Sequence, residues 1–177
     1  KYVCVPANAR IRRRIVAERM RALAEYAEQT PLNVAEGEGE TGVIASGVAY
    51  CYAREVFGEN VAYLKLGFTH PLPSEKIRKF CAGRKTVYVV EENDPYIEEH
   101  VKSLGIDCHG KDTFPAYGEL TPDVLRAALY GHRLPAIDYD CSAVVPRPPT
   151  LCAGCPHRGF FYDLSRRKNL MISGDIG

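Results

Sequence analysis

The 177 residues are enough for one ordinary α/β domain with short additions, but not for two full domains. A composition of 46% hydrophobic and 25% charged residues is typical of a globular chain and excludes a disordered, collagen-like or coiled-coil protein. The formal charge of +1 gives no strong field for a nucleic-acid backbone, so we do not expect nucleic acid as a partner. No apolar run approaches the roughly 18 residues of a membrane span, so we do not expect a membrane as a partner.

The cysteines indicate the compartment in which the protein works, and the two ends of the chain indicate that it is part of a longer protein. Seven cysteines are an odd number and most stand singly, which suits a reducing cytoplasm better than a secreted disulfide framework. We therefore expect a cytoplasmic protein. The chain begins with Lys1 instead of Met and stops at Ser-Gly-Asp-Ile-Gly (173–177), a sequence typical of a turn after a strand. Because a terminal strand needs neighbouring elements, we expect a piece of a longer polypeptide.

Residues 1–40 are predicted to form a helix and a connector. Apolar residues recur at helical spacing across residues 8–29, with Asn8 as a plausible N-cap. Six arginines crowd this helix, but glutamates alternate with them, which favours a solvent-exposed face or a surface that docks on a partner domain. Residues 37–42 have the spacing of a dinucleotide loop. They follow a helix and lead into a strand, and their glutamates would repel phosphate, so we interpret them as a flexible connector.

Residues 41–133 alternate between strand and helix signals. In chain order we expect a strand at 43–45, a helix at 46–57, a strand at 61–66, a helix at 73–80, a strand at 86–90, a helix at 95–104, a strand at 106–109 and a helix at 121–130. Continuous apolar strands separated by helices of about ten residues predict a parallel sheet covered on both faces. We therefore expect a three-layer α/β/α sandwich with a mostly parallel sheet.

The C-terminal part of the chain is predicted to contain a linker and the start of a second unit. Residues 134–150 contain several prolines and few apolar repeats, which predicts an extended linker. In residues 151–177 we expect a loop, a helix that ends near residue 168, a strand at 170–173 and a glycine-rich turn.

Two interpretations compete for Glu91-Glu-Asn-Asp94, which follows the strongest predicted strand. Loops at the carboxyl ends of parallel strands bind ligands, so a paired-carboxylate site is conceivable. We prefer a structural role, in which Asn93 and Asp94 cap the helix that opens at Pro95, because no histidine or cysteine converges on these carboxylates at a recognisable spacing. The histidines of this region stand alone, and we assign them no role.

Three interpretations compete for Leu-Cys-Ala-Gly-Cys-Pro-His-Arg-Gly at residues 151–159. Cys152 and Cys155 have the spacing of metal ligands, but a closed tetrahedral site needs a second pair and none is present. A thioredoxin-like redox pair would also place Cys-x-x-Cys-Pro before a helix. In that fold a strand precedes the pair, whereas here a proline-rich linker does.

The third interpretation of this segment is an anion cradle. Gly154 allows a ligand to approach the backbone closely, Pro156 suits the first helical position, and Arg158 adds a donor beside the helix N-terminus. A second candidate ligand loop, Gly-Asp-Ile-Gly at 174–177, follows a predicted strand in the same unit. Two such loops within under thirty residues favour this interpretation.

In combination, these motifs resemble a known family. Residues 148–158 (Pro-Pro-Thr-Leu-Cys-Ala-Gly-Cys-Pro-His-Arg) and 173–177 resemble the start of the thiamine-diphosphate domain in the α subunit of indolepyruvate ferredoxin oxidoreductases. Residues 42–50 (Gly-Val-Ile-Ala-Ser-Gly-Val-Ala-Tyr), 66–73 (Leu-Gly-Phe-Thr-His-Pro-Leu-Pro) and 89–98 (Val-Val-Glu-Glu-Asn-Asp-Pro-Tyr-Ile-Glu) resemble the family's middle domain, a relative of the transketolase C-terminal domain.

The resemblance implies that the whole enzyme oxidatively decarboxylates aryl 2-oxo acids such as indolepyruvate to acyl-CoA and passes electrons to ferredoxin. The implied cofactors are thiamine diphosphate with Mg²⁺ and iron–sulfur clusters elsewhere in the enzyme, with coenzyme A as co-substrate. The implied partners are the remaining domains of the α subunit, the β subunit and ferredoxin.

The same resemblance assigns the candidate site. The residues that would line one side of the thiamine diphosphate pocket are Cys152, Gly154, Cys155, His157, Gly174, Asp175 and Gly177. We assign no catalytic residue and no metal ligand, since the family's activating glutamate and its metal motif match no part of this sequence. We expect this chain alone to be inactive. The alternative function is a small thiol-redox or metal-binding module that uses Cys152 and Cys155.

Overall fold

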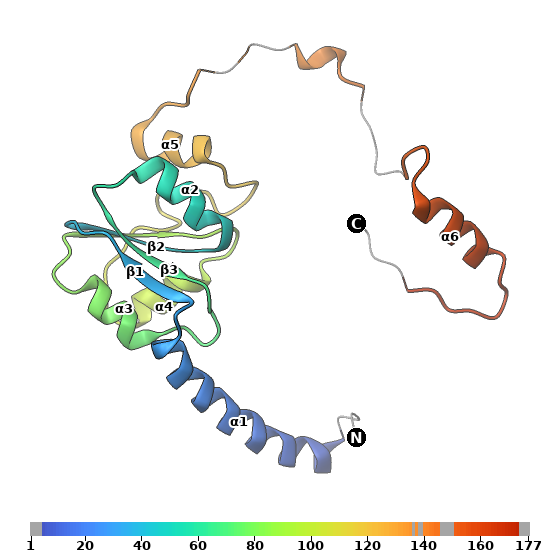
Figure 1. The fold of residues 1–177 in the computed structure, drawn as a ribbon, viewed down its shortest axis with the longest axis horizontal. Helices are drawn as coiled ribbons and strands as arrows, with labels where there is room; N and C mark the ends of the chain where they lie inside the picture. The colour runs from blue at the N-terminus through green and yellow to red at the C-terminus, as the bar shows by residue number, and fades with distance from the viewer. Residues whose placement is uncertain (1–4, 136, 138–139, 146–150, 174–177) are drawn as a thin grey trace. The chain divides into compact units, whose positions relative to one another are not determined.

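The computed structural model describes residues 5–135, 137, 140–145 and 151–173, which belong to two units, Lys1–Pro135 and Ala136–Gly177 (Figure 1). The elements in chain order are α1 (Pro6–Gln29), β1 (Asn33–Glu36), β2 (Thr41–Ser46), α2 (Gly47–Phe57), β3 (Ala62–Leu66), α3 (Ser74–Cys81), β4 (Thr86–Val90), α4 (Tyr96–Ser103), α5 (Pro122–Tyr130), the short 3₁₀ helix η1 (Cys141–Ala143) and α6 (Pro156–Ser165).

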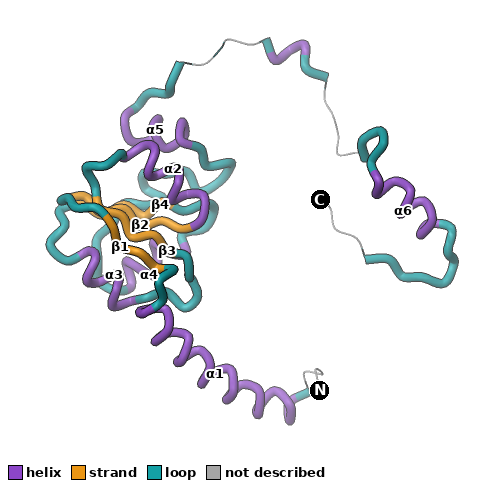
Figure 2. The backbone as a smooth tube through the Cα atoms, in the orientation of Figure 1, coloured by secondary structure: helices purple, strands orange, loops and turns teal. Residues whose placement is uncertain are grey.

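The sheet of the first unit has the strand order β1-β3-β2-β4 (Figure 2). The strand β2 pairs in parallel with β3 on one side and with β4 on the other, so that Ile44 lies opposite both Leu64 and Val89. The edge strand β1 runs antiparallel to β3. Residues 42–45 of β2 are all buried, because helices cover both faces of this central strand.

Helices form a layer on each face of the sheet, α2 and α5 on one and α3 and α4 on the other (Figure 1). Along β2, Ile44 packs into the core beneath α3 and α4, whereas Val43 and Ala45 pack into the core beneath α2 and α5. This alternation is the two-residue period of a strand. The predicted three-layer α/β/α sandwich with a mostly parallel sheet is therefore confirmed.

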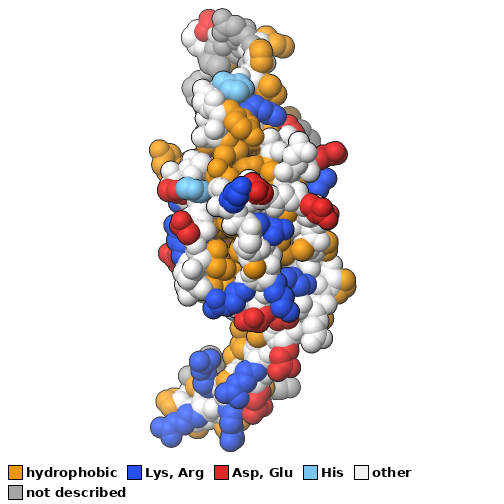
Figure 3. All heavy atoms as spheres, turned by 90° about the vertical axis from the view of Figure 1, so that its left-hand side faces the viewer, with side chains coloured by type: hydrophobic (Ala, Val, Ile, Leu, Met, Phe, Trp, Pro, Cys, Tyr) orange, Lys and Arg blue, Asp and Glu red, His pale blue; other side chains and the backbone are white. Residues whose placement is uncertain are grey.

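The predicted N-terminal helix is α1, which extends away from the sheet and carries a cluster of basic side chains (Figures 1 and 3). Only Ala27 of its 24 residues is buried. The arginines of this helix are all exposed, and they stand at positions 10, 12, 13, 14, 19 and 21. The predicted N-cap at Asn8 is wrong, because the helix already begins at Pro6, whose ring presets a helical φ at the first position.

The end of α1 is attached to the sheet through Asn33, a residue that is 3% exposed. Its Nδ2 donates to the carbonyl of Ala27 at 3.0 Å, and its Oδ1 accepts from the backbone N–H of Phe68 at 2.9 Å. Asn33 opens β1, a strand that the sequence did not predict. The four residues of β1, Asn-Val-Ala-Glu, are polar at both ends and too few to produce an alternating pattern.

Two predicted strands differ from the structure, while the other predicted elements between residues 41 and 130 lie within two residues of their expected limits. Instead of a strand at 106–109, the chain makes one parallel bridge beside β4, between Tyr88 and His109. Residues 170–173 have no regular structure, since no other described strand pairs with them, and α6 ends at Ser165 instead of near residue 168.

Candidate functional site

The loop before α6 forms a tight turn, in which the carbonyl of Cys152 accepts from the backbone N–H of Cys155 at 3.1 Å. Gly154 completes this turn with a φ of 77°, a conformation that side chains disfavour. The helix then starts directly, with Pro156 in its first positions. The sequence predicted both the glycine turn and the helix start, because each depends on a backbone preference of one residue.

Four of the predicted site residues lie together around this turn. The Sγ atom of Cys155 is 3.7 Å from Nδ1 of His157, and Cys152 and Gly154 belong to the same turn. The thiols of Cys152 and Cys155 are free. The remaining predicted site residues lie outside the described residues, and these are Gly174, Asp175 and Gly177.

The turn lies at the N-terminus of α6, where the sequence predicts an anion as the ligand. The first N–H groups of a helix have no partners within the helix, and the helix dipole places partial positive charge there. One of them, the N–H of Arg158, donates to the carbonyl of Cys155 at 3.1 Å. Within the part of the chain that the structure describes, no group of three or more histidine, cysteine, aspartate or glutamate side chains could hold a metal ion.

The helix that follows the turn presents aromatic side chains to solvent. No residue of α6 is buried, and Phe160, Phe161 and Tyr162 are 61%, 43% and 61% exposed. The rings of Phe160 and Phe161 contact each other edge to face, with centroids 5.9 Å apart. Because so much apolar surface stays exposed, the described part of this unit has no hydrophobic core of its own.

The first unit has its own candidate site, at the carboxyl ends of β2 and β4. The strand β2 leads to α2 on one face of the sheet and β4 leads to the loop before α4 on the other face. Adjacent strands whose connections diverge in this way define the switch point where open α/β sheets bind ligands. A cavity of about 260 Å³ lies here, between Ser46 and Gly47 at the start of α2 and Glu92 and Asp94 after β4.

The carboxylate of Glu91 at this switch point has a structural role. It accepts the backbone N–H groups of Ile97 and Glu98 at 2.8 and 2.9 Å, and thereby caps α4. Burial raises the pKa of Glu91, although both hydrogen bonds act in the opposite direction. The predicted structural role of residues 91–94, capping of the following helix, is confirmed. The predicted capping residues are wrong, because Glu91 caps the helix and the side chains of Asn93 and Asp94 make no cap.

The histidines to which the sequence assigned no role each have a polar partner. His70 Nδ1 lies 2.9 Å from the hydroxyl of Tyr96, which also donates to the carbonyl of Thr69. His100 Nε2 lies 3.0 Å from Oγ of Ser74. His109 Nδ1 lies 2.9 Å from a carboxylate oxygen of Asp112, and this contact lowers the pKa of Asp112. Only the last pair was available to sequence reasoning, since its partners are three residues apart.

Comparison with solved structures shows that this fold occurs in a known enzyme. No family model matches the chain. A solved structure of 2-oxoglutarate:ferredoxin oxidoreductase from Magnetococcus marinus, with 2-oxoglutarate, coenzyme A and succinyl-CoA bound, has a similar fold with a TM-score of 0.53. The similarity covers 73% of this chain and 24% of that chain, at 19% sequence identity. The fold is therefore one that a 2-oxoacid:ferredoxin oxidoreductase contains.

The sequence is similar to one kind of enzyme subunit. The indolepyruvate oxidoreductase subunit IorA of Methanothermobacter thermautotrophicus is 39% identical over 99% of this chain and 31% of its own length. The corresponding subunits of Archaeoglobus fulgidus and Pyrococcus abyssi are 35% and 33% identical, over 93% and 100% of this chain. Over nearly its whole length the chain is thus similar to one part of these indolepyruvate oxidoreductase subunits, and it spans about a third of the length of these curated relatives.

Proposed function

We propose that this chain is part of an enzyme that oxidatively decarboxylates aryl 2-oxo acids, indolepyruvate above all, to acyl-CoA and passes the electrons to ferredoxin. The observation that carries the proposal is the 33–39% identity to indolepyruvate oxidoreductase subunits over 93–100% of the chain. Its partners are the remaining domains of the α subunit, the β subunit and ferredoxin. The 177 residues alone hold too little of the site for turnover.

The turn before α6 is proposed to form one wall of the thiamine diphosphate pocket. When bound, this cofactor supplies the thiazolium carbon that adds to the 2-oxo group of the substrate. The open backbone at Gly154 and the N-terminus of α6 suit the diphosphate, and His157 beside Cys155 provides a polar side chain at the same end of the helix. Gly174, Asp175 and Gly177 are proposed to form a neighbouring wall.

The groups that the described residues do not hold are assigned to other parts of the enzyme. Mg²⁺ fits none of the described side-chain clusters, so its ligands are proposed to lie elsewhere, as are the iron–sulfur clusters. The exposed aromatic side chains of α6 support a packing surface for the rest of the thiamine-diphosphate domain. Coenzyme A is the proposed acyl acceptor.

The proposal is tested with the full α subunit and its β subunit. Indolepyruvate-dependent reduction of ferredoxin is measured for this complex and for the 177-residue chain, and we expect activity from the complex alone. Replacement Gly154→Ala in the complex should weaken activation by thiamine diphosphate at least about tenfold, because a side chain strains the turn and narrows the approach to the backbone.

The matched control for this replacement is Gly118→Ala. Gly118 has a similar positive φ of 83°, and a Cβ atom at either glycine would have open space around it, but Gly118 lies in the first unit. We expect G118A to leave cofactor activation unchanged. Turnover by the isolated chain, a complex that does not act on indolepyruvate, or equal effects of G154A and G118A would each contradict the proposal.

The alternative function, a thiol-redox or metal-binding module on Cys152 and Cys155, makes a different prediction. It requires stoichiometric zinc or a reversible disulfide in the isolated chain, which Cys155→Ala abolishes. Metal analysis and thiol titration of the chain with and without this replacement separate the two functions.

The described residues contain no helix long and apolar enough to cross a bilayer. The cytoplasmic location stays a prediction.

A further inference from the structure

The helix α1 carries a row of exposed apolar side chains. Ile11, Ile15 and Tyr26 are 60%, 47% and 49% exposed. Together with the exposed Ala22 they stand at positions i, i+4, i+11 and i+15, which share one face of a helix and are here called the apolar row. In proteins most helical stability comes from the packing of such a face against other elements. Within the described residues, however, only Ala27 of this helix is buried.

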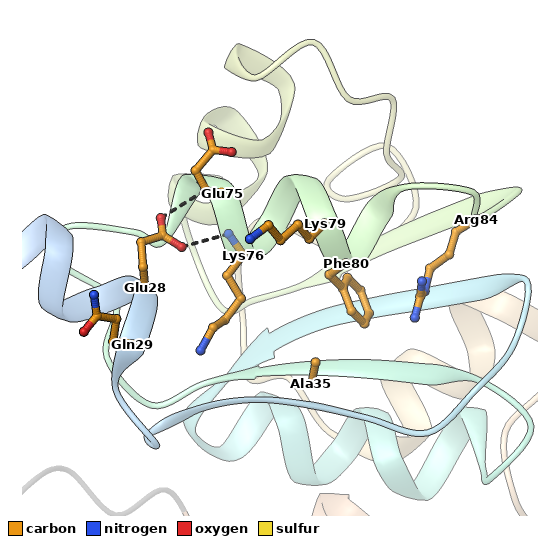
Figure 4. Close-up of a pocket in the computed structure, with 8 residues that line it drawn as sticks. All are labelled: Glu28, Gln29, Ala35, Glu75, Lys76, Lys79, Phe80 and Arg84. Atoms are coloured by element: carbon orange, nitrogen blue, oxygen red, sulfur yellow. Dashed lines mark hydrogen bonds between the residues drawn. The ribbon is translucent and has the colours of Figure 1, made fainter.

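The C-terminal end of α1 is fixed to the sheet and helices of the first unit. The ring of Tyr26 contacts the ring of Phe68 edge to face, with centroids 5.5 Å apart. The carboxylate of Glu28 accepts the backbone N–H groups of Glu75 and Lys76 at 3.0 and 2.8 Å (Figure 4). The N-terminal half of the helix therefore extends in a set direction, and its apolar face can dock with little loss of conformational freedom.

Arginines flank the apolar row on both sides. At about 100° per residue, positions 12 and 19 lie along one side of it and positions 14 and 21 along the other, where Glu18 and Glu25 also lie. Residues 10–21 contain six arginines and one glutamate, a formal charge of +5. A surface that matches this helix has an apolar centre surrounded by carboxylates, because charged groups at the rim of an interface select a partner of opposite sign.

The length of the relatives indicates where such a surface is available. Six indolepyruvate oxidoreductase subunits match 93–100% of this chain, but the match covers only 29–33% of their own length. About two thirds of each relative therefore lies outside the matched part. A domain of the same polypeptide is held near the helix at a high effective concentration. A second copy of α1 is a poor partner, because its arginines would repel those of the first.

We propose that the apolar row of α1 is the surface on which another domain of the same subunit docks, through an apolar patch ringed by aspartate and glutamate. The inference rests on the function proposed above, since it takes the chain to be part of a longer α subunit. The arginines at the sides of the row bind the carboxylates of the partner domain, because a guanidinium donates to a carboxylate through two N–H groups.

Hydrogen exchange followed by mass spectrometry tests this in the full α subunit, prepared without the β subunit, and in the 177-residue chain. We expect the amides of α1 to exchange at least about tenfold more slowly in the subunit, because the docked surface must separate before the helix opens. The strand β2 is the internal reference, since its residues 42–45 are already buried in this chain and their exchange should change little. Equal exchange of α1 in the subunit and the chain overturns the proposal.

This measurement requires no turnover, so the two proposals fail separately. An active complex in which α1 is unprotected contradicts the docking of α1 alone. A protected α1 in a complex that does not act on indolepyruvate contradicts the proposed function alone.

Two matched replacements locate the contact. Ile15→Gln should reduce the protection of α1 in the subunit by about tenfold, because it removes apolar surface from the contact. Val48→Gln is the control, since Val48 is 46% exposed, close to the value for Ile15, but lies on α2. Each variant is also measured in the 177-residue chain, and the ratio of the two rates cancels any change in the stability of the helix itself. Equal ratios for I15Q and V48Q would overturn the assignment of the row.

The charge of the partner surface is tested separately. Arg12→Glu combined with Arg19→Glu should reduce the protection of α1 by at least about tenfold, and added salt should reduce it in the unmodified subunit, because both weaken the attraction to carboxylates. The control is Arg133→Glu, at an exposed position of the first unit outside α1, which should leave the protection unchanged. Protection that is insensitive to the double replacement would overturn the acidic character of the partner.

Two other occupants of the apolar row give different results. Protection of α1 that rises with the concentration of the 177-residue chain, with none added in the subunit, would assign the row to a second copy. Protection by vesicles of phosphatidylcholine and phosphatidylserine, again with none in the subunit, would assign it to a membrane surface. Either result overturns the proposal.

Discussion

The carboxylate of Glu28, in the last turn of α1, accepts the backbone N–H of Lys76 at 2.8 Å and thereby caps a helix 48 residues further along the chain. Its other oxygen accepts the N–H of Glu75. The side chain of Glu28 thus accepts two of the N–H groups that have no partner within α3 at its N-terminus. The N-cap residue of α3, Pro73, makes no side-chain cap of its own.

We predict that Glu28→Ala lowers the free energy of unfolding by about 1–2 kcal/mol, the usual loss when a helix cap is removed. Urea denaturation followed by circular dichroism measures this value. The control is Glu25→Ala on the same helix, at an exposed position, which should change stability by less than about 0.5 kcal/mol. Equal effects of the two replacements would show that the contact with α3 contributes nothing.

Acidification should destabilise the fold through His100. Burial, with a smaller effect of the nearby Arg78 charge, lowers the pKa of His100 below its ordinary value of 6.5. The folded state therefore favours the neutral ring of His100 more than the unfolded state does. Above pH 6.5 the ring is neutral in both states, and the free energy of unfolding decreases as the pH falls below that value, because the unfolded chain binds the proton more readily. Urea unfolding between pH 7.5 and 5.5 should show a steeper loss for the unmodified chain than for His100→Gln. His132→Gln, at an exposed position, should keep the steep slope.

The cysteines should divide into two classes of reactivity. Burial raises the pKa of Cys81 and of Cys108 to about 11, so both thiols stay protonated at pH 8, whereas Cys51 and Cys152 are exposed. We expect iodoacetamide to modify the exposed pair at least about tenfold faster, because the thiolate is the reacting species and access is required. Peptide mass spectrometry measures each rate. The difference should disappear in denaturant, and similar rates in the native chain would contradict it.

The helix α6 should exchange its amide hydrogens much faster than the central strand of the sheet. None of its residues is buried, whereas residues 42–45 of β2 are buried on both faces. Protection against exchange depends on the free energy of local opening, which is small where few apolar contacts break. Hydrogen exchange of the 177-residue chain, followed by mass spectrometry, measures both segments. Protection of α6 equal to that of β2 would mean that packed contacts cover it in solution.

The central fold could be predicted from the sequence, because β2, β3 and β4 are mostly apolar runs and turn or cap residues mark helix boundaries in this unit. The cap of α5 is an example, since Thr121 Oγ1 accepts from the N–H of Val124 at 3.2 Å and Gly131 ends the helix with a φ of 73°. The edge strand β1 could not be predicted. It forms because β3 offers an open edge, and its own four residues contain little local information.

The candidate site could be predicted only where its geometry is local. The turn from Cys152 to Cys155 follows from a glycine and a proline, whereas the cap that Glu91 provides six residues further along depends on the path of the intervening loop. The contact between Gly42 and Arg84 had no sequence signal either. A Cβ atom on Gly42 would come within 2.6 Å of Cδ of Arg84, and the two residues come from separate segments that meet only in the folded chain.

The arginine-rich helix α1 gives the first unit an uneven distribution of charge, which the formal charge of +1 does not reveal. Residues 10–21 contain six arginines and one glutamate, so the compensating acidic residues must lie elsewhere in the chain. Such a separation of charge gives the first unit a large dipole moment. At low ionic strength it should adhere to a cation-exchange column above its sequence isoelectric point of about 7.7, with this helix toward the resin.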